Sequence, residues 1–325
     1  MTMSEMTYRE ALRQALKEKM EGDPRVLILG EDVGAYGGAY SVTRGLQEQF
    51  GPERVRETPI AESAIVGTAV GAAMAGMRPV AEIMTINFSL LAMDQIVNHA
   101  AKFHYMFAGK IRVPMVLRTV SGWGQLGATH SQTFENWFAS VPGLKVVMPA
   151  TPRDAKGLLK AAIEDDDPVI FIEHSLLYGV RGEVPDNDFR EQLGLALVVR
   201  EGTDVTIASY SRMLHVSLRA AAQLEEEGIS AEVIDLRTLR PLDMQTVYDS
   251  VRKTHRLVVA EEDWRTIGIG AEIAASVSEA CFDQLDAPVR RVAMPDVPMP
   301  YAKNLELALV PTEEEVVAAV RSQLG

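Results

Sequence analysis

The sequence predicts an α/β protein built from two domains, each with a parallel sheet covered by helices. Short and fully apolar runs such as 26–29 alternate with amphipathic helical segments, which is typical of strands buried on both faces of a parallel sheet. The pattern stops in a polar stretch and then starts again, and 325 residues are enough for two cores. We therefore expect domains at 1–185 and 201–325, joined by a linker at 186–200.

Composition narrows the classes of function. The formal net charge is -13 and only 6% of the residues are aromatic, so nucleic-acid binding is not expected. The single cysteine, Cys281, permits no internal disulfide and fits a reducing compartment. No apolar run reaches the ~20 residues of a membrane span, so no membrane partner is expected. Acids at Glu5 and Glu10 argue against a secretory signal. We expect a cytoplasmic protein, with an organellar matrix as the alternative if a transit peptide has been removed.

The first elements follow from a helix cap and an apolar run. Thr7 and Glu10 form a capping box that starts an amphipathic helix. The apolar strand at 26–29 ends in Gly30-Glu31-Asp32, at the carboxyl end where parallel sheets bind ligands. Acids in such loops are commonly only solvated, so their role stays open at this point.

A polar turn carrying Glu62 leads into a helix made of small and apolar residues. Gly67, Gly71 and Ala75 repeat every four residues, so one side of this helix has almost no side chain and we expect the helix to be buried. Glu62 has two interpretations. It is either an ordinary acid stabilised by the helix dipole, or a carboxyl whose pKa is raised by an apolar surrounding so that it can carry a proton.

The loop at 122–127, after a strand at 114–120, matches the dinucleotide pattern GxGxxG. A nicotinamide dehydrogenase would hold pyrophosphate there. The residues after Gly127 are polar, and the strand at 145–148 ends without an acid for a ribose, which disfavours that interpretation. His130 lies just beyond the loop. A lone loop histidine is commonly only exposed or hydrogen-bonded, but the polar neighbours of this one can fix its tautomer.

The helix that starts at Thr151 ends in the acidic run 164–167. Acids at a helix C-terminus oppose the dipole, so either water screens an exposed end or a cation binds carbonyl and carboxylate oxygens there. Beyond the linker, strands alternate with helices again. We expect strands near 205–209, 232–235, 257–260 and 289–293, and helices near 214–227, 243–253, 271–285 and 312–324.

Long motifs in one order carry a family resemblance. They are GEDVGAYGGAYSVTRGL at 30–46, TPIAES at 58–63, VGAAMAGMRPVAE at 70–82, DQIVNHAAK at 94–102, HSQ at 130–132, VPGLKVVMPATPRDAKGLLKAAI at 141–163, EVIDLRTLRPLD at 232–243 and DVPMPYAK at 296–303. Over essentially the whole chain, the sequence resembles the beta subunits of the heterotetrameric thiamine-diphosphate-dependent 2-oxo acid dehydrogenases. The resemblance implies a pyrimidine-binding domain followed by a transketolase-like C-terminal domain. The GAYGGAY and TINFS wording is similar to the pyruvate type, with the branched-chain 2-oxo acid and acetoin types as alternatives.

The resemblance also implies the site. Glu62, in the TPIxE motif, would promote the reactive tautomer of the cofactor's aminopyrimidine. His130 would orient the substrate or assist acyl transfer to a lipoyl group, and Glu31 would be an acid near the cofactor and the subunit interface. The pyrimidine pocket would be lined by Ile60, Met84 and Phe88. A structural K⁺ would have as ligands Met115, Ala162, Asp165 and Asp167, although the family commonly has an amide at the last position.

The GDG motif with which thiamine enzymes hold Mg²⁺ and diphosphate is absent from the sequence. The resemblance therefore implies half a site, completed by an alpha subunit in an α2β2 heterotetramer. That enzyme would decarboxylate a 2-oxo acid and pass the acyl unit to the lipoyl group of an acyltransferase core, docked through the second domain near Asp296. A flavin-dependent dihydrolipoyl dehydrogenase would complete the complex. Two other classes stay as alternatives: an NAD-dependent dehydrogenase built on 122–127, and a non-catalytic scaffold subunit.

Overall fold

The computed structural model describes residues 2–325 and divides into two compact units whose chain segments interleave. The first unit holds residues 2–121 and 137–193, and the second holds residues 122–136 and 194–325. The α/β class with parallel-rich sheets is confirmed. Segment 122–136 lies inside the range that the sequence predicts for the first domain, yet the structure groups it with the second unit.

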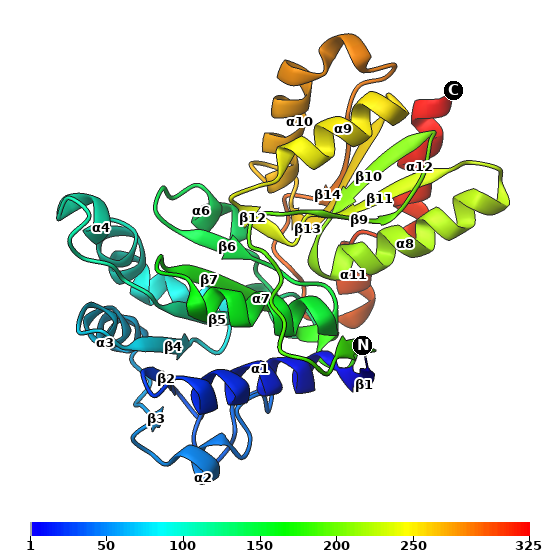
Figure 1. Cartoon of the computed structure of the whole chain (residues 1–325). Helices are drawn as coiled ribbons and strands as arrows, with labels where there is room; N and C mark the ends of the chain where they lie inside the picture. The colour runs from blue at the N-terminus through cyan, green and yellow to red at the C-terminus, as the bar shows by residue number, and fades with distance from the viewer. Residues whose placement is uncertain (1) are drawn as a thin grey trace. The chain divides into compact units, whose positions relative to one another are not determined.

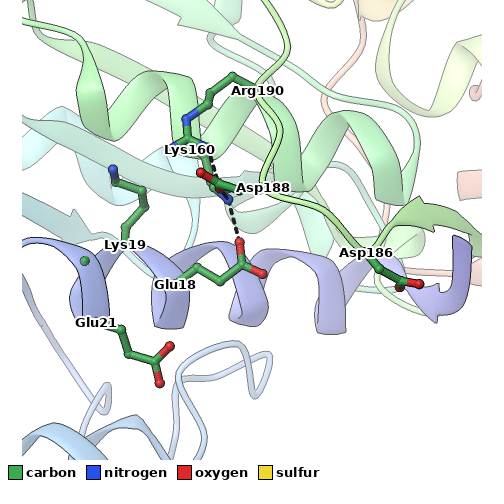
Figure 2. A pocket seen from close by; sticks show the side chains of 8 residues that line it. Glu18, Lys19, Glu21, Lys160, Asp186, Asp188 and Arg190 are labelled. Atoms are coloured by element: carbon green, nitrogen blue, oxygen red, sulfur yellow. Dashed lines mark hydrogen bonds and ion pairs between the residues drawn. The ribbon is translucent and has the colours of Figure 1, made fainter. Parts of the chain in front are cut away.

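The first unit is built on parallel strands in the order β6-β7-β5-β4-β2-β3 (Figure 1). The strands are β2 (Val26–Gly30), β3 (Val55–Glu57), β4 (Arg78–Glu82), β5 (Val116–Ser121), β6 (Lys145–Val147) and β7 (Val169–His174). The helices are α1 (Tyr8–Gly22), α2 (Leu46–Phe50), α3 (Glu62–Met74), α4 (Phe103–Met106) and α7 (Pro152–Glu164), with 3-10 turns at Ile86–Ala92 and Ser175–Leu177 and a π-helical turn at Gln95–Ala100. The short strands β1 (Met3–Thr7) and β8 (Arg181–Pro185) pair antiparallel.

Both faces of this sheet are covered, as the fully apolar strands predict. Helices α1 and α7 pack side by side and share one core with Val26 and Ile28 of β2 (Figure 1). The alternate residues Leu27 and Leu29 point to the opposite face and are buried as well, on the side where α3 packs against β2 and β4.

Local caps fix where the helices of this layer begin. Thr7 and Glu10 form both bonds of the predicted capping box at α1: the Thr7 hydroxyl accepts the Glu10 amide at 3.2 Å, and the Glu10 carboxylate accepts the Thr7 amide at 2.7 Å. Thr151 caps α7 in the same way by accepting the amide of Asp154 at 3.1 Å. Pro152 follows at the first helical position, where its missing N–H costs nothing.

The second unit carries a five-stranded sheet in the order β14-β13-β10-β11-β9. Its strands are β9 (Leu197–Arg200), β10 (Val205–Ser209), β11 (Ala231–Asp235), β13 (Leu257–Trp264) and β14 (Arg290–Met294), with β12 (Thr238–Arg240) outside this sheet. The helices are α5 (Gly127–His130), α8 (Ser211–Glu226), α9 (Met244–Thr254), α10 (Ile269–Ala280), α11 (Lys303–Leu307) and α12 (Glu313–Leu324), with a 3-10 turn at Phe282–Gln284; α6 (Glu135–Ala139) spans the boundary between the units. In Figure 1, α8 packs with α12 and α9 packs with α10. β9 is antiparallel to β11 and lies within the predicted linker.

Helix α3 is half-exposed, whereas the sequence pattern predicts a buried helix. Its apolar face, with Ile65 and Val66, is in the core. The small-residue face is open: Gly71 and Ala75 are exposed, and a Cβ added at Gly71 would meet nothing within 4 Å. Small residues on a helix face indicate close approach of another backbone, but their pattern does not say whether that backbone belongs to the same chain.

Gly143 fits so tightly that we expect Gly143→Ala to destabilise the chain strongly. Gly143 has a φ of +100°, and a Cβ there would lie 2.0 Å from the carbonyl oxygen of Ala101. Gly76 is the matched control, because its φ is +96° but nothing lies within 4 Å. Both substitutions strain the backbone by about 1–3 kcal/mol. In urea titrations, Gly143→Ala should lower the free energy of unfolding by at least ~2 kcal/mol more than Gly76→Ala does. Equal losses would show that the backbone near Ala101 yields without cost.

Candidate active site

Acidic side chains gather at the carboxyl ends of β2 and β3, the edge of the sheet where the sequence places Glu31. Glu57 ends β3, and Glu62 opens α3. Burial raises the pKa of Glu31. Neighbouring negative charges raise it further, namely those of Asp32, Glu62 and Glu57. The structure thus brings Glu31 and Glu62 into one electrostatic cluster, in which Glu31 keeps a proton to a higher pH than an isolated glutamic acid.

Glu62 is buried even though it opens a helix. Only 7% of its surface is exposed, and Ala61 before it has no side chain to cap α3. The helix dipole favours a carboxylate at this place, and the Ile65 side chain one turn on is buried in the core. Its position lets Glu62 stabilise the helix start, and it places a buried carboxyl near the carboxyl ends of the strands, where parallel sheets commonly bind ligands.

The apolar residues of the expected pyrimidine pocket lie on segments that adjoin Glu62. Ile60 precedes it by two residues and is 73% exposed. Met84, which follows β4, and Phe88, in the 3-10 turn Ile86–Ala92 that packs against α3, are half-buried. The expected pocket residues thus offer apolar surface that is not fully buried, on segments that adjoin the buried acid.

His130 ends the short helix α5 in segment 122–136 of the second unit, and its side chain is half-buried. The turn before α5 needs several left-handed residues, among them Gly124 at φ 145° and Gln125 at φ 59°. After the histidine, the Gln132 side-chain amide donates to the carbonyl of Thr129 at 2.7 Å, which closes the HSQ segment locally.

The GxGxxG loop has its backbone donors engaged within the protein. The Glu306 carboxylate accepts the amide of Gly124 at 3.1 Å and that of Gln125 at 2.8 Å. A pyrophosphate would need those same donors. The helix that follows is α5, which has only four residues, so no dinucleotide-binding helix is formed. The structure therefore argues against the nicotinamide alternative.

The acidic end of α7, where a K⁺ is expected, carries an internal cation. The Lys145 ammonium lies 2.7 Å from the Asp165 carboxylate and 3.2 Å from that of Asp167. The carbonyl of Met115 accepts the Val169 amide at 2.9 Å, and the carbonyl of Ala162 accepts the Asp165 amide at 3.3 Å. Each carbonyl has a second lone pair for an ion, whereas both carboxylates are engaged. Within residues 2–325, no group of three or more His, Cys, Asp or Glu side chains is arranged to hold a metal ion.

The first sheet encloses a charged triad that the sequence pattern did not reveal. Arg118 of β5 binds Glu173 of β7 through two hydrogen bonds, at 2.7 and 2.9 Å, and Glu82 of β4 at 2.6 Å. The Tyr178 hydroxyl donates to Glu173 at 2.6 Å. Arg118 is only 2% exposed and Glu173 is fully buried. The three charged residues lie on three different strands, so only the pairing of β4, β5 and β7 identifies the partners.

A second acidic cluster, in the second unit, was also missed. Glu261 and Asp263 are fully buried in β13, and Glu135 is 1% exposed in α6. The predicted strand stops at Ala260, because three consecutive acids follow it. The large apolar residue Trp264 beyond those acids was the available signal that the strand continues.

The two units and the buried acid at the sheet edge define a two-domain protein of the transketolase type. The first part of the chain matches the family model described as transketolase, pyrimidine binding domain, over residues 4–180, and the second matches transketolase, C-terminal domain, over residues 194–316. The chain belongs to the family of pyruvate dehydrogenase E1 component beta subunits. The resemblance and the domain types inferred from the motifs are thereby confirmed.

The family is shown by relatives along the full length. The chain is 54% identical to the mitochondrial pyruvate dehydrogenase E1 component subunit beta-2 of Oryza sativa, over 98% of this chain and 86% of the relative. It is 50% identical to the E1 subunit beta of Rickettsia bellii, over 98% of each chain. Among solved structures it is similar to a split-gene transketolase, an inactive beta4 tetramer, with a TM-score of 0.81, 29% identity and coverage of 98% of both chains.

Proposed function

We propose that the chain is the beta subunit of a heterotetrameric pyruvate dehydrogenase, which decarboxylates pyruvate oxidatively and transfers the acetyl unit to a lipoyl group. The observation that carries the proposal is the buried Glu62 next to the exposed Ile60, in a chain that matches subunits of this name over their length. The alternatives within the same fold are the beta subunits of branched-chain 2-oxo acid dehydrogenase and acetoin dehydrogenase. The scaffold alternative would need Glu62 to be dispensable.

The residues at the sheet edge fit the pyrimidine end of thiamine diphosphate. This cofactor supplies the nucleophilic carbon and the electron sink for loss of CO₂ when it is bound. In our proposal, Glu62 would bind the pyrimidine ring nitrogen and exchange a proton with it, and the residues that would contact the ring are Ile60, Met84 and Phe88. Glu31, whose pKa is raised by burial and by neighbouring acids, is a second proton-holding group near the cofactor. His130 orients the substrate or assists acyl transfer.

The diphosphate end is assigned to an alpha subunit. The sequence has no GDG motif, and the part of the chain that the structure describes shows no acidic or histidine cluster suited to Mg²⁺. We propose an α2β2 assembly in which the alpha subunit holds Mg²⁺ and the diphosphate. The open face of α3 around Gly71 fits close packing against another subunit, because no side chain keeps a second backbone away.

The second unit is the proposed docking region for the lipoyl-bearing acyltransferase core, with dihydrolipoyl dehydrogenase as the further component. Around Asp296, Val297 is 47% exposed and Tyr301 is 70% exposed, while the Asp296 carboxylate is held by the Thr266 hydroxyl at 2.6 Å. Such an apolar surface beside a fixed acid fits a protein partner. No helix of residues 2–325 is long and apolar enough to cross a membrane. Relatives include mitochondrial and bacterial proteins, and we propose a cytoplasmic or matrix location.

A K⁺ at the end of α7 is proposed to bind the carbonyls of Met115 and Ala162, with Asp165 and Asp167 as outer partners shared with Lys145. We expect K⁺ to raise the unfolding temperature over choline at equal ionic strength. The gain should be larger in Lys145→Met, because the carboxylates then lose their ammonium partner. Calorimetry in K⁺, Na⁺ and choline measures this. Identical midpoints for both proteins in all three salts would contradict a K⁺ site.

The proposed function is tested by co-purification and assay. The tagged chain is isolated from its native extract, and the eluate is assayed for thiamine-diphosphate- and Mg²⁺-dependent decarboxylation of pyruvate, beside 3-methyl-2-oxobutanoate and acetoin. Activity with a co-purifying second subunit is expected, with pyruvate as the preferred substrate. A different preferred substrate would correct the assignment. A chain that purifies without a partner or any thiamine-dependent activity would overturn it in favour of the scaffold alternative.

A further inference from the structure

Segment 122–136 carries His130, and we call it the His130 loop. Polar contacts hold it to the rest of the second unit near both of its ends. At the start of the loop, the Glu306 carboxylate accepts the amides of Gly124 and Gln125 at 3.1 and 2.8 Å. Glu306 is only 1% exposed, so this contact is shielded from water. The start of the loop is therefore held by the buried Glu306 carboxylate, which accepts hydrogen bonds from two backbone amides of the loop.

The far end of the loop is fastened by two carboxyls and by the Asn136 side-chain amide, which donates to the carbonyl of Ile267 at 3.1 Å. The Thr133 hydroxyl donates to Asp263 at 3.0 Å, and the Tyr210 hydroxyl donates to Glu135 at 3.2 Å. All four residues are buried, with Glu135 1% and Asp263 0% exposed. Each carboxyl uses one oxygen in these bonds. The other oxygen of each, Oε2 of Glu135 and Oδ2 of Asp263, is buried without a hydrogen-bond partner among residues 2–325.

The charges around the two carboxyls do not balance. The titratable and charged groups that face the pair are Glu261 of β13, Tyr210 at the end of β10 and Arg291 of β14. Arg291 donates to Glu261 at 2.9 Å and so gives that acid a paired cation. Glu262, on the same strand, has its own cation, because Arg212 donates to it at 2.7 Å. Two buried carboxyls are thus left without a paired cation, which is costly if both are ionised.

The titration of the pair agrees with this geometry. Burial raises the pKa of Glu135 well above its usual value, and the charge of Asp263 raises it further. Burial, and then the charge of Glu261, raise the pKa of Asp263 to about 7. A proton held by either carboxyl near neutral pH removes one of the two unpaired charges from the buried site.

We propose that Glu135 and Asp263 are positioning residues for His130, and that the far end of the His130 loop stays fastened only while at least one of the two carboxyls carries a proton. When both are ionised, two unpaired charges share a buried site, and the loop opens to let water reach them. The inference rests on the proposed place of His130 in the active site. Its structural half concerns the loop alone and is tested separately.

Amide hydrogen exchange of the assembled enzyme between pH 6 and pH 8.5 tests the fastening. After correction for intrinsic exchange rates, protection of 122–136 should fall by about tenfold per pH unit above pH 7 in the wild type. Asp263→Asn has the same shape and a permanent donor, and only Glu135 is left to titrate, so its protection should fall by less than that of the wild type over the same pH range. Glu135→Gln gives the same test if Asp263→Asn does not fold. Asp204→Asn is the control, because its carboxylate accepts from the Thr203 hydroxyl and the Ser230 amide, neither of which belongs to the His130 loop. Its profile should match the wild type.

Two outcomes of the exchange experiment would overturn the inference. One is wild-type protection that does not change with pH, and the other is an Asp263→Asn profile equal to that of the wild type. The activity profile supplies the second readout: kcat should decline above pH 7 in the wild type, and this decline should be smaller in Asp263→Asn. His130→Ala separates the two proposals. If it keeps full activity, the role of His130 fails while the exchange data still decide whether the loop is fastened by a proton.

Discussion

Glu62→Gln should lower kcat of the assembled enzyme by about 10²–10⁴-fold, the range for loss of a positioned proton-transfer group. The amide keeps the size of the carboxyl and fills the same buried place at the start of α3, so the subunits should still assemble. It no longer takes up and returns a proton, which is the task proposed for Glu62 at the pyrimidine ring. The measurement is pyruvate decarboxylation by the purified heterotetramer with saturating thiamine diphosphate and Mg²⁺.

The matched control for this variant is Glu53→Gln, which removes a carboxylate from the same region of the first unit. Glu53 is exposed and pairs only with Arg56 at 2.6 Å, so its loss should leave kcat unchanged. Cofactor affinity is measured in parallel, because weaker binding alone would raise the thiamine diphosphate requirement and leave kcat intact. Full activity of Glu62→Gln at saturating cofactor would remove Glu62 from the mechanism and favour a scaffold role.

The second large effect is expected in stability. Arg118→Met should lower the free energy of unfolding by about 3–5 kcal/mol, because it leaves Glu173 and Glu82 buried without their cation. Methionine keeps much of the volume, so the loss comes from charge and not from a cavity. Urea titrations at one fixed subunit concentration measure it, since association also contributes to apparent stability.

The pH dependence of this loss identifies its cause. Burial raises the pKa of Glu173, and removal of the Arg118 charge raises it further, so the folded variant binds a proton that the unfolded chain does not hold at neutral pH. Stability of the variant should therefore fall as pH rises from 5 to 8, relative to the wild type. Arg153→Met, at a half-exposed arginine paired with Glu191, should cost less than ~1 kcal/mol. A loss for Arg118→Met that is equally small would show that water or rearrangement compensates the triad.

The sequence was informative where the structure depends on local chemistry. The capping box at Thr7 and the Thr-Pro cap at Thr151 predict where α1 and α7 begin, and the fully apolar strands predict a sheet covered on both faces. The long motifs predict the family and name Glu62, which the structure places at the expected sheet edge together with Glu31. These signals come from residues a few positions apart or from contiguous sequence motifs, so they can be read without knowledge of the fold.

The remainder depends on contacts between distant residues. The predicted boundary placed segment 122–136 in the first domain, because nothing nearby marks its partners, and Thr133 and Asp263 are 130 positions apart. The same holds for the Lys145 ammonium at the end of α7, since a strand lysine does not indicate which carboxylates it will meet. The open face of α3 shows a third limit: a row of glycine and alanine is the same in a buried helix and in one that awaits another subunit.

The interleaved units also affect the order in which a ribosome delivers this protein. Glu306 lies 181 positions after Gln125, which it holds. At about 5–20 residues per second, that distance corresponds to ~10 to 40 s of synthesis. During this time the sheet of the first unit can form, while the stretch around His130 waits without its acceptors. The catalytic histidine proposed here is therefore among the last parts of the nascent chain to be fixed, and a chain released before Glu306 would display a finished first sheet and an unfastened reactive loop.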